Sequence, residues 1–128
     1  ADRARTPAMK IDSTEFGSIT VDGTTYPHDI LIHLSGEVVK RKKKLSKKHY
    51  GTSHTISLEE AEFVFEKGCD TLVLGTGQHG NVRLSPEAAE FFEHHGCRVI
   101  LKPTPDAIKT YNKTRGNARA IGLFHVTC

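Results

Sequence analysis

The segment TLVLGTGQHGNVRLSPEAAEFFEHHGCRVIL, residues 71–101, decides the fold class. Its two apolar runs, residues 71–74 and 98–101, have the length and composition of short buried strands. Between them, Ser85-Pro86-Glu87 starts a helix with serine as N-cap and proline in the first turn, and Gly96 ends it. A strand–helix–strand unit of this kind predicts parallel strands joined by a right-handed crossover.

The same alternation continues on both sides of this segment. Ser57-Leu58-Glu59-Glu60 is a capping box that opens a helix ending at Gly68. Thr104-Pro105-Asp106 opens a third helix, and residues 119–128 predict a final strand. The carboxylates of these helices, Glu60 included, are expected on the solvent-facing side.

The N-terminal part, residues 16–41, predicts a β-meander instead. Ile19 and Val21 alternate with polar residues, and Asp22-Gly23 is a strong signal for a hairpin turn. Further strands are expected at residues 30–32 and from residue 38, with a turn at residues 35–36. The following basic residues are expected to continue the last strand, as an edge strand, into a loop. The sequence thus predicts one α/β domain over residues 9–128, with an N-terminal β-meander, alternating strands and three helices. Residues 1–8 are expected to be a disordered start or a tag remnant.

Length and composition limit the classes of protein. The chain has 128 residues, enough for one hydrophobic core, and no apolar stretch long enough to span a bilayer. It opens without a signal-peptide pattern, and its three cysteines have no close spacing. These features predict a cytoplasmic protein without a disulfide framework.

Positive charge is concentrated in KRKKKLSKK, residues 40–48. The chain has a net charge of +3, so the remainder is net acidic. The tract is either a solvated strand end or a patch that binds RNA, DNA or an anionic membrane. The basic patch consists of Lys40, Arg41, Lys42, Lys43, Lys44, Lys47 and Lys48.

The glycine loop has the spacing G-x-G-x-x-G at Gly75, Gly77 and Gly80. A nucleotide-binding turn needs its third glycine in the first turn of the helix, whereas this helix starts at Ser85, and the expected acidic residue after the next strand is missing. The glycines either turn the chain sharply or also shape a polar pocket at the carboxyl ends of the strands. The side chains that would line such a pocket are Thr76, Gln78, His79, Ser85, Lys102 and Thr104.

Catalytic patterns are weak. His125 and Cys128 form a nucleophile–base or metal pair only if the final strand has ended, since residues three apart on a strand face opposite sides. A serine–histidine–aspartate set from Ser85, His79 or His125, and Asp106 lacks the G-x-S-x-G elbow. The histidines show no ligand spacing. We therefore expect no metal, no cofactor and a non-enzymatic role.

Several elements occur in the order of a known family: FGSITVDGTTYPHDILI, LVLGTGQHGNVRLSPEAAEFFEHHG, KPTPDAIKTYN and GLFHVTC. Through them the chain resembles the Mth-nine-three-eight-like domain family over residues 9–128. The resemblance implies an α/β fold with a mixed central sheet, and no catalytic mechanism. Eukaryotic relatives include the adipogenesis-associated domain protein and NADH dehydrogenase assembly factor three. The shared residues, expected around one pocket or interaction face, are Gly75, Thr76, Gly77, Gln78, Pro103, Thr104, Tyr111, Asn112, His125 and Cys128.

Three classes of function remain. The first is a non-catalytic binding or assembly module, as the resemblance to a respiratory-complex assembly factor implies, with other proteins as partners and a homodimer as an option. The second is a protein that binds a small polar metabolite at the loop of residues 75–80. The third is a nucleic-acid or anionic-surface binder that uses residues 40–48.

Overall fold

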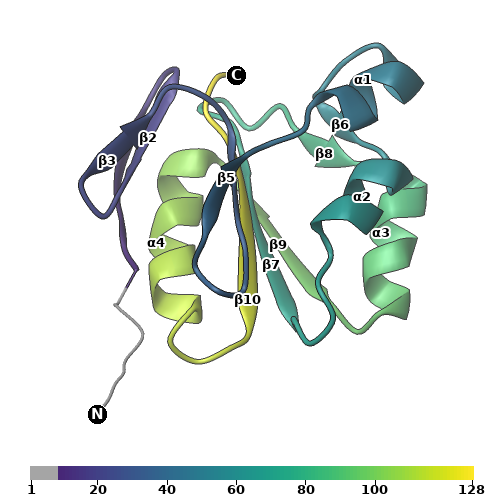
Figure 1. Cartoon of the computed structure of the whole chain (residues 1–128). Helices are drawn as coiled ribbons and strands as arrows, with labels where there is room; N and C mark the ends of the chain where they lie inside the picture. The colour runs from purple at the N-terminus through teal and green to yellow at the C-terminus, as the bar shows by residue number, and fades with distance from the viewer. Residues whose placement is uncertain (1–8) are drawn as a thin grey trace.

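A five-stranded mixed sheet forms the centre of the molecule (Figure 1). The structure is a computed structural model and describes residues 9–128; the start expected to be disordered, residues 1–8, lies outside the described residues. The central sheet has the strand order β5-β4-β10-β7-β9. Its strands are β4 (Ile30–Ile32), β5 (Val38–Lys40), β7 (Thr71–Thr76), β9 (Arg98–Lys102) and β10 (Ala120–His125).

Three neighbouring strands of this sheet run parallel. β10 pairs with β7, and β7 pairs with β9, in parallel register, whereas β4 and β5 add antiparallel strands at the other edge. The predicted crossover around residues 71–101 is confirmed, with α3 (Pro86–His94) between β7 and β9. β5 is the edge strand that the basic residues follow, also as predicted.

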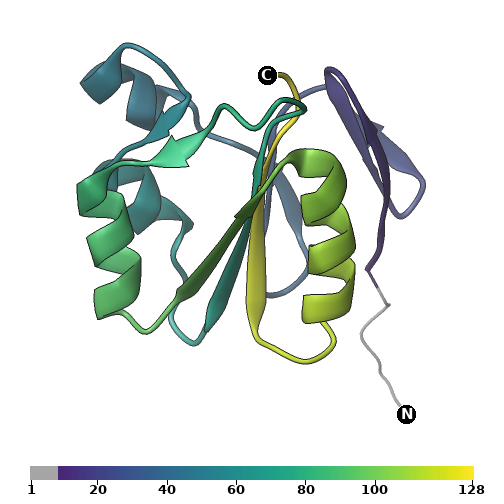
Figure 2. The same cartoon turned by 180° about the vertical axis from the view of Figure 1, so that it is seen from behind.

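Helices cover both faces of the central sheet (Figures 1 and 2). α2 (Leu58–Val64) and α3 pack on one face, and α4 (Thr104–Thr114) packs on the other. Successive side chains of β10 point to opposite faces of the sheet and so contribute to the hydrophobic cores on both faces. Ile121 and Leu123 face α2 and α3, while Phe124 faces α4.

The predicted β-meander is wrong in one respect. Asp22 and Gly23 make the expected turn, with φ of +48° and +82°, but the turn joins β2 to a strand not foreseen from the sequence. These two strands and a preceding strand form a separate three-stranded sheet. This sheet packs against α4, because its apolar side chains belong to the same hydrophobic core as those of α4. The strands of this sheet are β1 (Ile11–Glu15), β2 (Ser18–Val21) and β3 (Thr24–Tyr26).

The basic tract also differs from prediction, since it forms a fourth helix, α1 (Lys44–Tyr50), in place of a loop. Ser46 of α1 is buried against the start of α2. Its hydroxyl accepts a hydrogen bond from the backbone N–H of Ser57, the N-cap of α2, at 2.9 Å. This tertiary contact holds a segment whose sequence has no N-cap signal. A short parallel pair, β6 (Thr55–Ile56) and β8 (Arg83–Leu84), connects the region to α3.

Candidate functional site

The glycine loop after β7 packs against the C-terminal segment of the same chain. A Cβ atom at Gly75 would lie 2.8 Å from the Phe124 ring and 2.9 Å from Thr104 Oγ1. At Gly77, where φ is +106°, it would overlap the backbone carbonyl group of Cys128. The space that a nucleotide phosphate would need is therefore filled by protein backbone.

Thr104 joins three segments at this point. Its hydroxyl accepts a hydrogen bond from the Gly77 N–H at 2.9 Å and donates one to the His125 carbonyl at 2.6 Å. The Thr104 N–H in turn donates to the Gly77 carbonyl at 2.9 Å. The side chain is fully buried, so its role is to fasten the loop, α4 and β10 together.

Several other residues expected at a pocket have polar atoms paired within the fold. Ser85 accepts from the Ala88 N–H as the N-cap of α3, and Gln78 donates to Thr14 Oγ1 at 3.0 Å. His79 lies beside the exposed Phe16 ring. The Ser85 hydroxyl and the Gln78 side-chain amide nitrogen are therefore already used within the fold.

The residues shared with the family, which were expected around one pocket or interaction face, are dispersed. The buried Tyr111 packs edge-on against Phe124 and so joins α4 to β10, whereas Asn112 bonds both backbone groups of Ile11 and holds β1 to α4. The structure therefore brings only part of the set together, at the ends of β7 and β10. The members that meet there are Gly75, Thr76, Gly77, Thr104, His125 and Cys128, while Pro103 precedes α4 as its exposed N-cap.

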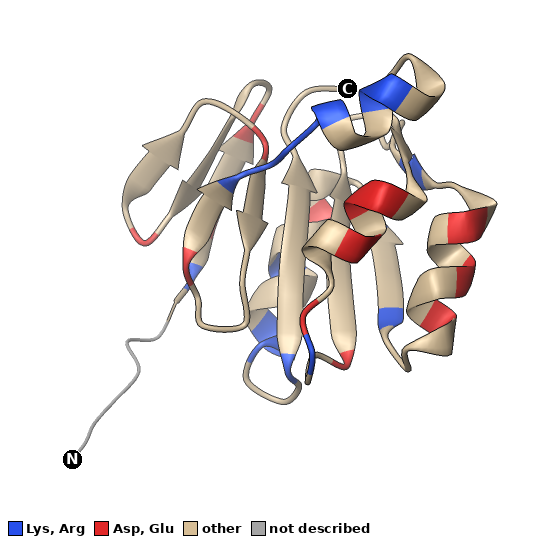
Figure 3. Cartoon of the chain, turned by 45° about the vertical axis from the view of Figure 1, so that its right-hand side comes forward, with Lys and Arg blue, Asp and Glu red and all other residues tan. Residues whose placement is uncertain are grey.

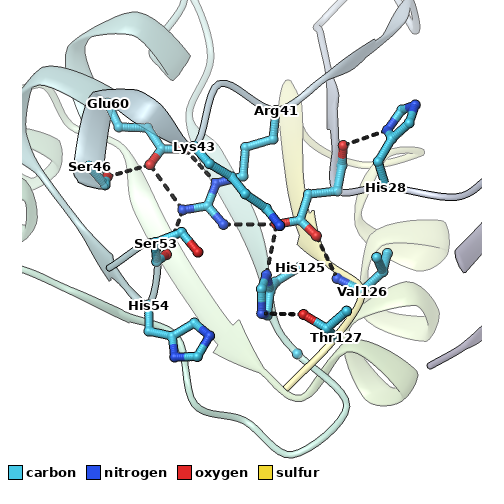
Figure 4. Close-up of polar contacts among 12 residues, drawn as sticks. His28, Arg41, Lys43, Ser46, Ser53, His54, Glu60, His125, Val126 and Thr127 are labelled. Carbon is cyan, nitrogen blue, oxygen red and sulfur yellow. Dashed lines mark hydrogen bonds and ion pairs between the residues drawn. The ribbon is translucent and has the colours of Figure 1, made fainter. Parts of the chain in front are cut away.

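The most charged part of the interior was not foreseen from the sequence. Arg41, expected in the solvent-exposed basic patch, is 4% exposed, and Glu60, expected on a helix surface, is 1% exposed. The Arg41 guanidinium donates to both carboxylate oxygens of Glu60, and its Nη1 donates to Asp29 Oδ2 at 2.9 Å (Figure 4). Arg41 is buried because two carboxylates neutralise it and remove the cost of burying a lone charge.

One half of this network had a signal in the sequence. The predicted strands at residues 30–32 and from residue 38 pair with Ile30 opposite Lys40, which brings Asp29 next to Arg41. Glu60 had no comparable signal, because only the packing of α2 against α1 brings it to Arg41. There, the Ser46 hydroxyl donates to Glu60 Oε1 at 2.5 Å.

His125 lies against the same carboxylate at the end of β10. Its Nδ1 is 2.7 Å from Asp29 Oδ2, and the Val126 N–H donates to Asp29 Oδ1 at 2.9 Å. Burial by itself would raise the pKa of Asp29, but the hydrogen bonds from His125 and Val126, with the charges of His125 and Arg41, lower it to about 2. Asp29 is therefore ionised at neutral pH.

The opposite edge of the His125 ring faces two further groups. Its Nε2 lies 3.1 Å from Thr127 Oγ1, and the His54 ring packs edge-on at 5.2 Å between ring centroids. Burial and the charges of His125 and Arg41 lower the pKa of His54. Figure 4 shows His125 between the Arg41 side of the network and Thr127.

An open groove of about 660 Å³ lies over Asp29 and Thr127, and we call it the basic groove. Lys43 reaches into the network from its wall, with Nζ 3.7 Å from Asp29 Oδ2. Of the predicted basic patch, four lysines line the groove, whereas Lys47 and Lys48 lie farther along α1. The groove is lined by Gly17, Pro27, His28, Asp29, residues 40–44, Val126 and Thr127.

Basic and acidic residues lie on different elements of this part of the chain (Figure 3). Basic residues cover the segment that leads into α1, while the helices α2 and α3 carry acidic residues. Within residues 9–128, no group of three or more His, Cys, Asp or Glu side chains is placed to hold a metal ion. None of the helices in that range combines the length and apolar character that crossing a bilayer requires.

Comparisons with known proteins agree on the family. Residues 11–125 match the model of a family described as protein of unknown function (DUF498/DUF598). The conserved hypothetical protein PH1505 from Pyrococcus horikoshii OT3 is 39% identical with a TM-score of 0.87, over 93% of this chain and 99% of that one. The protein MT938 is 34% identical with a TM-score of 0.79, over 94% and 99% of the two chains. A Bordetella pertussis protein described as a Mth938-like domain shares the fold, at 21% identity and a TM-score of 0.60, over 98% of this chain and 90% of that one.

Proposed function

Because the chain belongs to the Mth938-like family of proteins of unknown function (DUF498/DUF598), we propose its role from its own geometry: it is a binding module that docks an acidic segment of a partner protein in the basic groove. The observation that carries this proposal is the lining of the groove. Four lysines, Lys40, Lys42, Lys43 and Lys44, line the groove together with the exposed side chain of Pro27.

The charge of the groove favours an anionic occupant. Among the described residues, Lys43 is the groove lysine that pairs with a carboxylate, Asp29, and that carboxylate already pairs with Arg41. Lys40 and Lys44 add positive charge to the groove lining, and the ammonium group of Lys42 lies over the Phe63 ring, 4.7 Å from its centroid. An acidic ligand gains from these charges mainly in its rate of association and in its specificity.

The scarcity of aromatic rings in the groove lining favours a peptide over a nucleic acid. Sequence-tolerant binding of single strands depends on aromatic side chains that stack on bases, and His28 is the one ring in the groove lining. A peptide supplies carboxylates for the lysines together with an apolar side chain for Pro27. The resemblance to an assembly factor also supports a protein partner.

The three free cysteines support a reducing, cytoplasmic setting as part of the same proposal. Cys69 and Cys97 are buried, and Cys128 is half-buried. Burial, with the neighbouring Cys69 and Asp70, raises the pKa of the Cys97 thiol to about 12, so this thiol stays protonated.

Fluorescence anisotropy tests the proposal with a labelled peptide of alternating glutamate and leucine, its glutamine counterpart and a labelled single-stranded RNA. We expect the acidic peptide to bind, and the double variant Lys40→Glu/Lys44→Glu to weaken binding at least about tenfold. The matched control is Lys47→Glu/Lys67→Glu, which changes charge equally at exposed lysines outside the groove.

Equal losses in the two double variants would contradict the proposal, because net charge and not the groove would then control binding. Preferential binding of RNA, with an affinity that falls steeply between low and physiological salt, would support a nucleic-acid binder instead. Failure of the acidic peptide to bind better than its glutamine counterpart would also refute docking by charge.

A further inference from the structure

Beside the basic groove, two successive hydrogen-bonding contacts join a hydroxyl, an imidazole and a carboxylate. Thr127 Oγ1 is 3.1 Å from His125 Nε2, and His125 Nδ1 is 2.7 Å from Asp29 Oδ2. Neither Ser85 nor Asp106, the partners considered from the sequence, belongs to this set. Ser85 is used as the N-cap of α3, and Asp106 lies exposed in the first turn of α4.

The orientation of the imidazole follows from its partners. An ionised carboxylate only accepts hydrogen bonds, so in the neutral ring His125 Nδ1 carries the proton and Nε2 carries a lone pair. The Thr127 hydroxyl then donates to that lone pair, which is the arrangement of an alcohol nucleophile and its general base. His125 is 2% exposed, and its ring is held by Asp29 on one side and His54 on the other.

Thr127, unlike the buried His125, is partly exposed. Thr127 is half-buried and lines the groove together with the lysines of residues 40–44. We propose that Thr127 and His125, oriented by Asp29, hydrolyse an ester whose acid part carries a further negative charge. The inference rests on the groove of the proposed function for the capture of its substrate.

The reaction proceeds in two balanced steps. Thr127 Oγ attacks the carbonyl carbon of the ester while His125 Nε2 accepts the hydroxyl proton, and the leaving alcohol then takes this proton as the C–O bond breaks. Water, deprotonated by His125, attacks the acyl-threonine ester, releases the carboxylic acid and restores the Thr127 hydroxyl. The groove lysines would attract and hold the anionic end of the acid.

The test uses the full chain and two chromogenic substrates, the mono-p-nitrophenyl ester of succinic acid and neutral p-nitrophenyl acetate. We expect kcat/KM to be higher for the anionic ester. Thr127→Val, which keeps the shape but removes the hydroxyl, should lower it by about 100-fold or more. Thr127→Ser should retain activity within about tenfold, and both variants are compared with wild type by thermal unfolding to exclude a loss of fold.

Mass spectrometry locates the acyl group. The tryptic peptide of residues 120–128 should carry a succinyl group at Thr127, and Cys128→Ser should leave both labelling and turnover within about twofold, because the adjacent thiol is the obvious competing nucleophile. Acylation at Cys128 or at lysines only, or equal turnover by Thr127→Val and wild type, would overturn the inference.

The two proposals fail separately. Binding of the acidic peptide without Thr127-dependent turnover would refute the hydrolysis and leave the docking role in place. Thr127-dependent hydrolysis of both esters at equal rates, with no binding of the acidic peptide, would refute the docking role. Lys40→Glu/Lys44→Glu should raise KM for the anionic ester, whereas Lys47→Glu/Lys67→Glu, at exposed lysines outside the groove, should leave this KM within about twofold.

Discussion

Arg41 and Glu60 form a two-pronged ion pair inside the protein, with Nε 2.7 Å from Oε2 and Nη2 3.1 Å from Oε1. The same guanidinium also reaches Asp29 and the Ser53 carbonyl, so one buried side chain connects β4, α2 and the loop before β6. The two carboxylates raise the pKa of Arg41 against the lowering effect of burial. Two members of this network, Arg41 and Asp29, line the basic groove, and Asp29 also contacts His125.

Replacing Arg41 with methionine should destabilise the protein strongly. Asp29 and Glu60 would remain buried without their cation, and breaking a buried pair in this way costs about 3–5 kcal/mol. Urea denaturation measures the free energy of unfolding, with Lys47→Met as the control at an exposed site of the same basic tract. A loss for Arg41→Met as small as that of the control would show that the network contributes nothing to stability.

Stability should decline in acid because of Asp29. Its pKa is lowered from 3.8 to about 2 in the folded protein, so the ionised carboxylate stabilises the fold above pH 4. This contribution, about 2 kcal/mol, is lost as the pH falls from about 4 through about 2. Denaturation curves between pH 2 and 7 should show the decline in wild type and a smaller one in Asp29→Asn. Asp106→Asn, at an exposed carboxylate, should follow the wild-type curve.

Gly77→Ala should destabilise more than an alanine at a glycine of similar backbone conformation. Gly68 has φ of +96° and open space where an alanine methyl group would lie, whereas Gly77 has φ of +106° and the Cys128 backbone in that position. Both substitutions carry about 1–2 kcal/mol of left-handed strain, and the clash at Gly77 adds about 1–3 kcal/mol. Thermal unfolding of the two variants gives the comparison, and equal shifts in Tm would mean that the C-terminal segment moves aside without cost.

Asn112→Ala should loosen the small sheet before it affects the central one. The Asn112 side chain accepts from the Ile11 N–H and donates to the Ile11 carbonyl, both at 2.9 Å, and so fastens β1 to α4. Amide hydrogen exchange should accelerate in β1 and β2 and stay slow in β7 and β10. Asn117→Ala, which removes a single exposed contact of 3.4 Å, is the matched control. Uniform acceleration across both sheets would contradict this local role.

Local patterns in the sequence predicted much of the fold. The N-caps Ser57 and Ser85 accept the expected hydrogen bonds from Glu60 and Ala88, because capping depends on residues three positions apart. Asp22-Gly23 makes its turn for a similar reason, since both residues adopt the positive φ that this turn requires. The strand it leads to was misplaced, because a turn does not determine which later strand joins which sheet.

The candidate site was predicted less completely. The glycine loop, Thr104 and His125 were selected and do meet, since parallel strands end at one edge of a sheet. Asp29 and Glu60 were not selected. Strand pairing indicated that Asp29 lies next to Arg41, but the distance in the chain from Asp29 to His125 hid that contact, and Glu60 carries no pattern that distinguishes a buried carboxylate from an exposed one.

The sequence by itself determined the α/β class, the parallel crossover, the helix starts and the tight turns of this protein. Each depends on side chains within a few residues of one another, where periodicity and backbone sterics act directly. Only the tertiary structure decided that Arg41 is buried, that Glu60 faces inward, and that Thr127, His125 and Asp29 align beside the basic groove. Those outcomes depend on charges brought together from distant segments, because a buried ion is stable only where folding supplies its partner.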